Sequence, residues 1–280
     1  MITVTAPDGL DLKKIADSGQ AFRLSCTGPG SYRLLAGRRL LCLTQEDPSG
    51  PVRLSCTPAE YNDFWKKYFD LDTDYRAIAG QIPASDPYLW EAARFGRGIR
   101  ILRQDPWEMT VTFILSQRKN IPAIKKSVEN LCCAAGQPLL SETGETLHAF
   151  PTPDELSQLS LEDLKACGLG YRARYIRQTA AEVASGKAPL PQWAGENDSS
   201  LLEHLLSLSG VGNKVASCIM LFGFHRLNAF PKDVWILKVL KDRYHGAFDP
   251  AVYSPYAGIM QQYLFYYIRA EETGRLPVRQ

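Results

Sequence analysis

Two residues in the last third of the 280-residue chain have types and a spacing that could support covalent chemistry. Lys214 directly follows the short turn Ser209-Gly-Val-Gly-Asn213, and Asp233 lies in the segment Phe230-Pro-Lys-Asp-Val-Trp235. An amine becomes a nucleophile only when it loses its proton, which a helix N-terminus favours slightly and burial favours more strongly. A carboxylate beside it can stabilise positive charge that develops on a substrate. The pair therefore predicts a covalent active site.

Each member of this pair also has an ordinary structural interpretation. A lysine in the first turn of a helix is usually a solvated surface residue. Asp233 precedes the apolar run Val234-Trp-Ile-Leu237, so it can act as an N-cap that stabilises the helix by about 1 kcal/mol. Capping and chemistry are compatible for Asp233, because backbone N–H groups that bind its carboxylate also favour its ionised form.

The turn before Lys214 is predicted to join two helices. Ser200-Leu-Leu-Glu203 has the capping-box pattern and opens the first helix. Its apolar face consists of Leu201, Leu202, Leu205, Leu206 and Leu208. The buried side of the second helix consists of Val215, Cys218, Ile219 and Phe222. Between them, Gly210, Val211 and Gly212 can bring backbone amides close to a phosphate, although a tight turn that needs glycine only for its dihedral angles fits equally well.

The remaining elements predict an α+β fold. Short β-type runs separated by turn residues occupy residues 2–5, 22–26, 32–35, 40–44 and 52–56. A capping box at Thr57-Pro-Ala-Glu60 then opens the first of many helices, and residues 186–197 are expected to form a surface connection. We therefore expect an N-terminal antiparallel β-sheet domain with flanking helices over residues 1–95. An all-helical domain over residues 96–280 would follow, with its helix-hairpin-helix at residues 200–222.

Composition limits the classes of protein to consider. With 32 basic and 30 acidic residues the formal charge is only +2, so binding to nucleic acid must depend on local features. Seven cysteines without a CxxC pair, and four histidines without metal-ligand spacing, predict neither a disulfide framework nor a metal site. Neither a membrane span nor a secretory signal is predicted, which favours a cytoplasmic location. Arginines at positions 94, 97, 100 and 103 predict a solvated helix face rather than a phosphate track.

Several longer motifs resemble one protein family. The hairpin, its lysine and the downstream Pro-Lys-Asp-Val segment are similar to the helix-hairpin-helix DNA glycosylase superfamily. The motifs that narrow the resemblance to the 8-oxoguanine DNA glycosylase family are Ser18-Gly-Gln-Ala-Phe-Arg23, Tyr68-Phe-Asp-Leu-Asp72, Phe113-Ile-Leu-Ser-Gln-Arg-Lys-Asn-Ile121, Leu147-His-Ala-Phe-Pro151 and Gly168-Leu-Gly-Tyr-Arg-Ala-Arg-Tyr175. They occur in order over most of the chain, and the last of them is highly specific.

The resemblance implies roles for residues of the active site. Lys214 would attack C1′ of the deoxyribose and form a Schiff base that proceeds to β-elimination, with Asp233 stabilising the oxocarbenium-like state. The carbonyl of Gly19 would accept the N7–H that 8-oxoguanine has and guanine lacks. Gln261 would read the edge of the flipped base, and Phe265 and Cys218 would form the two walls of its pocket. Ordinary core packing is the alternative for Phe265 and Cys218.

The chain also departs from the family pattern. Arg118 stands at the position of an asparagine and Ala123 at that of an arginine, two residues that hold the cytosine opposite the lesion in family members that require it. Arg172 is retained beside Tyr171, the expected wedge, so we predict a relaxed preference for the opposite base. Trp235 replaces a histidine common in the family. The residues expected to contact DNA are Arg118, Asn120, His148, Tyr171, Arg172, Gly210, Val211 and Gly212.

The resemblance implies double-stranded DNA containing 8-oxoguanine as the partner of a monomeric, nucleoid-associated prokaryotic enzyme. No cofactor is required, although a monovalent or divalent cation could bridge the hairpin and a DNA phosphate. Two alternatives stay open. One is a related glycosylase that removes an alkylated base or an oxidised pyrimidine. The other is a non-catalytic helix-hairpin-helix protein that only binds the DNA backbone, which would need no Lys214–Asp233 pair.

Overall fold

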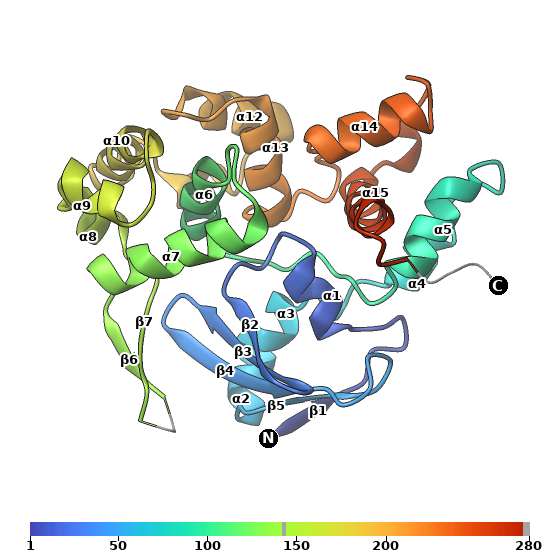
Figure 1. Cartoon of the computed structure of the whole chain (residues 1–280), viewed down its shortest axis with the longest axis horizontal. Coiled ribbons are helices and arrows are strands. Elements are labelled where there is room, and N and C mark those ends of the chain that lie inside the picture. The colour runs from blue at the N-terminus through green and yellow to red at the C-terminus, as the bar shows by residue number, and fades with distance from the viewer. Residues whose placement is uncertain (142–143, 277–280) are drawn as a thin grey trace.

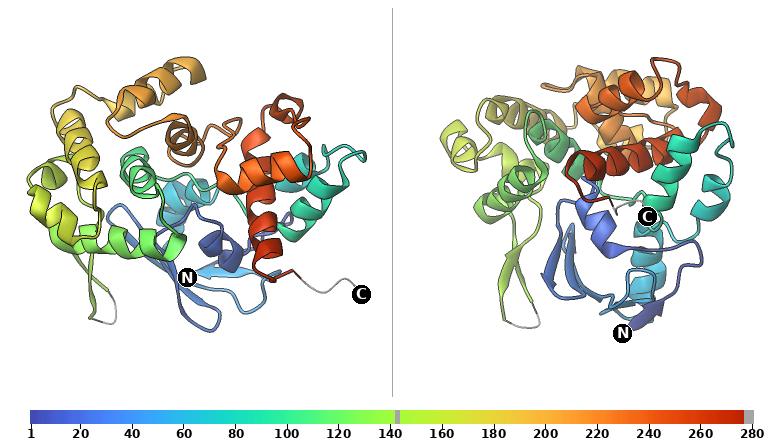
Figure 2. Two further views of the ribbon diagram at one scale, coloured as in Figure 1. Left: turned by 45° about the horizontal axis from the view of Figure 1, so that its top comes forward. Right: turned by 45° about the vertical axis from the view of Figure 1, so that its right-hand side comes forward.

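A computed structural model describes residues 1–141 and 144–276, and it confirms the predicted α+β organisation (Figure 1). An antiparallel sheet of five strands, in the order β1-β5-β4-β3-β2, lies along one side of the molecule, and helices occupy the other (Figures 1 and 2). The strands are β1 (Ile2–Val4), β2 (Leu24–Gly28), β3 (Ser31–Ala36), β4 (Arg39–Thr44) and β5 (Val52–Leu54). Each lies within two residues of its predicted start.

The sheet packs its apolar face against a small core of its own. In the β3–β4 pair Leu34 lies opposite Leu41 and Tyr32 opposite Leu43, so alternate residues point to the same face. These side chains pack with α1 (Leu12–Asp17), η1 (Tyr61–Trp65) and α3 (Lys66–Tyr68), whereas α2 (Pro58–Glu60), which runs directly into η1, has no buried residue. Thr57 caps the start of α2 with both bonds of a capping box, as predicted.

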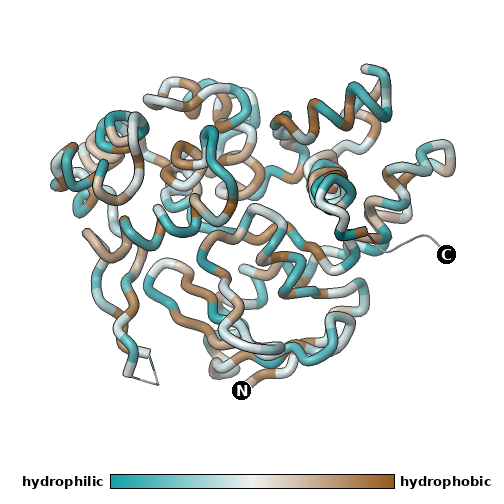
Figure 3. Tube along the Cα trace, in the orientation of Figure 1, coloured by the Kyte–Doolittle hydropathy of each residue, from teal (hydrophilic) through white to brown (hydrophobic). Residues whose placement is uncertain are grey.

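A larger core joins the other helices. They are α4 (Tyr75–Ala79), α5 (Pro87–Phe95), α6 (Pro106–Leu115), α7 (Ile121–Ala135), α8 (Pro153–Ser157), α9 (Leu161–Ala166), α10 (Arg172–Ala184), α11 (Leu190–Trp193), α12 (Asp198–Ser207), α13 (Asn213–Phe222), α14 (Val234–Asp242), η2 (Pro250–Tyr253) and α15 (Ala257–Glu272). Hydrophobic and hydrophilic residues alternate along most of them, as expected for helices with one buried face (Figure 3). Helix α6 is buried on all sides and packs against α13. Helices α4 and α5 precede the boundary predicted at residue 95 and pack in this core.

Several local predictions are wrong. Residues 138–148 contain a two-stranded ribbon, β6 (Pro138–Leu140) and β7 (Thr146–His148), inside the part expected to be all helical. The predicted surface connection includes α11, which buries Leu190 and Trp193. Helix α12 begins at Asp198 with Asn197 as its N-cap, so Ser200 does not cap it. Leu206 is exposed and does not belong to the apolar face of this helix.

The four regularly spaced arginines do not form a solvated helix face. Helix α5 ends at Phe95, and Arg100 is 1% exposed, in an irregular segment between the two cores. Its guanidinium group forms an ion pair with Asp8 and donates to the carbonyls of Gly9, Asp70 and Thr73. A buried guanidinium group with this many partners offsets the cost of its desolvation. The arginine spacing is therefore coincidental.

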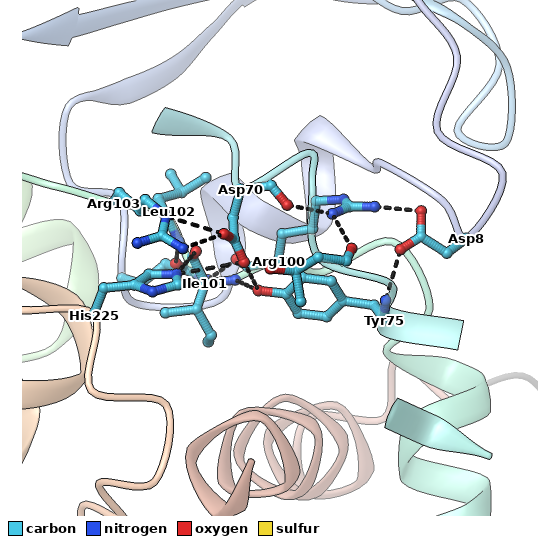
Figure 4. Close-up of polar contacts among 10 residues, drawn as sticks. Asp8, Asp70, Tyr75, Arg100, Ile101, Leu102, Arg103 and His225 are labelled. Atoms are coloured by element: carbon cyan, nitrogen blue, oxygen red, sulfur yellow. Dashed lines mark hydrogen bonds and ion pairs between the residues drawn. The ribbon is translucent and has the colours of Figure 1, made fainter. Parts of the chain in front are cut away.

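Asp70 is the centre of a polar cluster between the two cores (Figure 4). Its carboxylate accepts from the hydroxyl of Tyr75 at 3.0 Å, pairs with Arg103 at 3.0 Å and faces Nε2 of His225 at 3.4 Å. Burial raises the pKa of Asp70, but hydrogen bonding and charge from His225 and the charge of Arg103 outweigh this and lower it to about 2. The carboxylate is therefore ionised at neutral pH. It links the sheet side of the chain to the loop after α13.

We predict that Asp70→Asn lowers the free energy of unfolding at pH 7 by about 2 kcal/mol, because one pKa unit corresponds to about 1.4 kcal/mol. The folded-state pKa lies below the ordinary value of 3.8, so this stabilisation is present above about pH 4 and is lost as the pH falls towards 2. Urea unfolding of wild type and variant at pH 7, 5, 4 and 3 measures the difference. A difference that stayed constant over this range would contradict the role given to the ionised carboxylate.

Candidate active site

The turn between α12 and α13 is shaped by one of its two glycines. Gly210 has a φ of +78°, and a Cβ there would lie 2.5 Å from Cγ of Tyr175, so both its dihedral angle and its contact require glycine. Gln117, in the loop after α6, donates its amide to the Gly210 carbonyl at 3.0 Å. Gly212 has an extended backbone, is the N-cap residue of α13, and has open space where a Cβ would lie. The alternative of a turn that needs glycine only for its dihedral angles therefore does not explain Gly212, whose open side leaves room for a phosphate.

Lys214 lies in the first turn of α13, as predicted, and is half-buried against α6. Its Nζ lies 3.5 Å from Oγ of Ser116 and 5.6 Å from the centre of the Phe113 ring. The Ser116 hydroxyl donates to the Phe113 carbonyl at 2.8 Å, so its oxygen is left to accept from the lysine. Sequence reasoning missed Ser116 because it lies almost a hundred residues before its partner. Its contact with Lys214 orients the amine.

Cys218 is one turn after Lys214 and is buried. Burial raises the pKa of its thiol, while the nearby Lys214 opposes the rise. The thiol is therefore neutral at pH 7. A neutral sulfur beside the amine is consistent with the predicted pocket wall and supplies no competing nucleophile.

Asp233 is the N-cap of α14, as predicted. Its carboxylate accepts from the backbone N–H of Trp235 at 3.0 Å and of Ile236 at 2.9 Å. Burial raises the pKa of Asp233 above its ordinary value, although the bond from Ile236 and the charge of Lys214 oppose the rise. The sequence predicted that backbone hydrogen bonds favour the ionised carboxylate. It did not account for the larger, opposing effect of burial on the pKa. Lys214 lies close enough for its charge to act on the carboxylate.

Gly19 lies against Phe265, which brings the predicted base contacts together. Gly19 has a φ of +76°, and a Cβ there would lie 3.2 Å from Cε1 of Phe265 and 3.1 Å from Cδ1 of Ile121. A larger residue would be strained and would also displace the ring. Ile121, at the start of α7, is an apolar neighbour that the sequence did not single out. Segments from the first domain, α7 and α15 therefore meet here.

Gln261 is 4% exposed, on the buried side of α15. Its amide nitrogen donates at 3.1 Å to the carbonyl of Pro231, two residues before Asp233. Its Oε1 is buried and has no hydrogen-bond partner within the described structure. A buried acceptor left unpaired costs stability, so it fits a group that meets a donor only when a ligand is bound.

The residues expected at the opposite strand lie on the loop after α6 and at the start of α10. Tyr171 is 52% exposed, as a wedge requires. Arg172 stacks over the Tyr171 ring at 4.4 Å, but it is buried and donates to the carbonyls of Gln117 and Leu169. Arg172 therefore supports the wedge from beneath in this structure. Arg118 is exposed with a φ of +51°.

Three further predicted residues have identifiable structural roles. Asn120 caps α7 by accepting from Ala123, which occupies its side-chain oxygen. Val211 is buried beneath the turn and leaves contact with a phosphate to the backbone. His148 ends β7, where its carbonyl accepts from Arg23, so the structure connects it to the sheet side of the molecule rather than to the hairpin.

A cavity of about 750 Å³ lies outside this site, between the β3–β4 turn, α3 and the start of α6. Its lining includes Arg39, Lys67, Arg103 and Glu108 and none of the predicted active-site residues. Burial raises the pKa of Glu108 to about 8. The candidate active site is thus identified by its converging side chains.

In residues 1–141 and 144–276, no helix is long and apolar enough to cross a lipid bilayer.

Comparisons with known proteins agree with this geometry. Residues 1–110 match the N-terminal domain of 8-oxoguanine DNA glycosylase, and residues 111–248 match the HhH-GPD superfamily of base excision DNA repair proteins. The chain is 30% identical to N-glycosylase/DNA lyase OGG1 of Arabidopsis thaliana, over 89% of this chain and 74% of that protein. It is 34% identical to the N-glycosylase/DNA lyase of Saccharomyces cerevisiae over 64% of this chain, and it spans only 50% of that relative.

Solved structures are similar over almost the whole chain. MBOgg1 in complex with a low-affinity DNA ligand has a TM-score of 0.89 and 36% identity, covering 97% of this chain and 96% of that one. The 8-oxoguanine glycosylase/lyase of Clostridium acetobutylicum, bound to double-stranded DNA with cytosine opposite 8-oxoguanine, has a TM-score of 0.86 and 33% identity, covering 98% and 99%. Both domains, in order, and the converging residues lead to one conclusion. The chain belongs to the 8-oxoguanine DNA glycosylase family within the HhH-GPD superfamily.

Proposed function

We propose that this chain removes 8-oxoguanine from duplex DNA and then cleaves the strand at the abasic site. The buried, unpaired Oε1 of Gln261 carries the proposal for base recognition, since it is an acceptor without a donor beside Phe265 and the Asp233 loop. The N–H groups on the Watson–Crick edge of a flipped guanine-type base would supply that donor. The carbonyl of Gly19 would accept N7–H, and guanine would present a lone pair there instead.

The proposed reaction uses Lys214 as the nucleophile. Its neutral Nζ forms a bond to C1′ while the bond from C1′ to N9 of the base breaks, and the base leaves with the bonding electrons and takes up a proton. The bond from C1′ to the ring oxygen then breaks, that oxygen takes up a proton from water, and a protonated Schiff base forms. Loss of a proton from C2′ then expels the 3′ phosphate, which leaves with the electrons of its bond to C3′. Asp233 stabilises the positive charge on the sugar in the first step.

Contacts with the DNA complete the proposal. Backbone amides at Gly212 and the start of α13 would bind a phosphate, directly or through a monovalent or divalent cation, and Tyr171 would fill the gap left by the flipped base. The reaction as written uses no cofactor. We propose that the protein acts as a monomer on chromosomal DNA, in the nucleoid if its source is prokaryotic.

Borohydride trapping distinguishes this proposal from a protein that only binds DNA. We expect wild-type protein to form a covalent adduct with a duplex containing 8-oxoguanine, because the Schiff base can be reduced, and we expect Lys214→Gln to form none. Lys232→Gln is the matched control, since Lys232 is exposed and lies next to Asp233. No adduct with wild type would favour the binding protein, and adducts only with alkylated bases or oxidised pyrimidines would favour the other glycosylase.

The raised pKa of Asp233 predicts an acidic limb in the excision rate. Asp233 must be ionised to stabilise the sugar, so the rate should fall as the pH drops through a pKa above the ordinary aspartate range. Asp233→Asn should slow excision by about 100-fold and remove this limb, while asparagine still caps α14. Single-turnover excision between pH 4 and 8 measures both effects. If the excision rate of Asp233→Asn still fell at acidic pH as in wild type, this fall would be due to another titrating group.

Ala123 predicts a relaxed preference for the base opposite the lesion. It cannot donate to an orphaned cytosine, and Arg172 is already bound to protein carbonyls. We expect excision rates opposite cytosine, adenine, guanine and thymine to agree within about tenfold, and Ala123→Arg to raise the preference for cytosine. A cytosine preference well above tenfold in wild type would refute this prediction.

A further inference from the structure

The peptide before Gly19 is held by a side chain of α15. Gln262 donates its amide to the carbonyl of Ser18 at 2.7 Å. Gln262 is 2% exposed and Ser18 is 1% exposed, so this bond is shielded from water and its loss would leave a buried carbonyl unpaired. Gln262 directly follows Gln261, the residue assigned to the base edge. Neighbouring residues of one helix thus face the base and the loop that would distinguish it.

A second residue of the same helix holds the same loop. Arg269 donates to the carbonyl of Asp17 at 2.9 Å, one residue before Ser18. Its guanidinium group also lies 5.1 Å from the centre of the Phe265 ring. Arg269 therefore ties the loop to the aromatic ring on which the base would stack.

The residue after Gly19 is held from the opposite direction. The amide nitrogen of Gln20 donates to the Arg100 carbonyl at 2.9 Å, and its amide oxygen accepts from Leu102 at 2.9 Å. Gln104 donates to the backbone carbonyl of Gln20 at 3.1 Å. Gly19 therefore lies between two anchored residues. Without these anchors a glycine would move readily between backbone conformations and turn its carbonyl.

We propose that Gln262 and Arg269 are positioning residues that fix the direction of the Gly19 carbonyl and so determine how strongly the protein prefers 8-oxoguanine to guanine. This inference rests on the proposed function. The two bases differ at N7, which donates in one and carries a lone pair in the other. A carbonyl aimed at N7 therefore attracts the first and repels the second, whereas a carbonyl turned away does neither.

The main test uses Gln262→Met, which keeps the side-chain length and removes the donor. In a Lys214→Gln background, the ratio of Kd for a guanine duplex to Kd for an 8-oxoguanine duplex should fall about tenfold. With Lys214 present, single-turnover excision of 8-oxoguanine should slow about tenfold. Cleavage of a preformed abasic site needs no base recognition, so its rate should change less than threefold. A general loss of structure would slow both reactions equally.

Gln178→Met is the matched control, because Gln178 is exposed on α10 and its amide donates to Glu182 of the same helix. Arg269→Met, scored by the same Kd ratio, tests the second anchor and replaces Gln262→Met if that variant does not fold. An unchanged Kd ratio in the folded variants, or a parallel loss of lyase activity, would refute the positioning role. If the wild-type chain itself binds both duplexes equally and excises no 8-oxoguanine, the proposed function fails first.

Discussion

The fold depends on how one buried segment, which pairs with no strand, forms hydrogen bonds with its backbone N–H and C=O groups. Residues 99–104 run between the two cores outside any regular element, and several of their peptide groups are bonded by side chains. The hydroxyl of Tyr75 accepts from the N–H of Ile101 at 2.8 Å, and Nε2 of His225 lies 3.1 Å from the Ile101 carbonyl. Gln20 bonds both neighbouring peptides. Side chains from both layers thus bind one strip of backbone, which fixes the layers relative to each other.

This arrangement places the active site across the junction. Gly19 is next to Gln20 in the sheet domain, whereas Lys214, Asp233 and Gln261 belong to helices of the second core. In the proposed reaction, the sheet domain therefore contributes a recognition group to chemistry carried out by the helices. Because Gln20 is bonded to the connecting segment, a shift between the layers would also move the Gly19 carbonyl. Base recognition in the proposed reaction is accordingly coupled to the docking of the two domains.

Structural features that depend on a few neighbouring residues could be predicted from the sequence. The position of Lys214 in the first turn of α13 and the cap at Asp233 follow from capping and helix periodicity, and both are confirmed. The buried role of Arg100 and the contacts of Ser116 and Gln262 were missed, since their partners lie far away in the chain. The spacing of the four arginines led to a wrong prediction of one helix face, because a period of three residues cannot reveal that α5 ends at Phe95. Local sequence patterns therefore predicted the candidate reacting groups, whereas the residues that contact them were found only in the structure.

Burial and nearby positive charge have opposite effects on the pKa of Asp233, and this constrains the proposed reaction. Burial raises the pKa of the carboxyl group, and the positive charge of Lys214 is among the influences that lower it. Lys214 must become neutral to attack, which removes that influence, but positive charge then develops on the sugar beside the same carboxylate. The protonated Schiff base afterwards returns the charge to Nζ. In the proposed reaction Asp233 thus faces a positive charge in the resting protein, in the transition state and in the intermediate, so this half-buried carboxylate can stay ionised throughout.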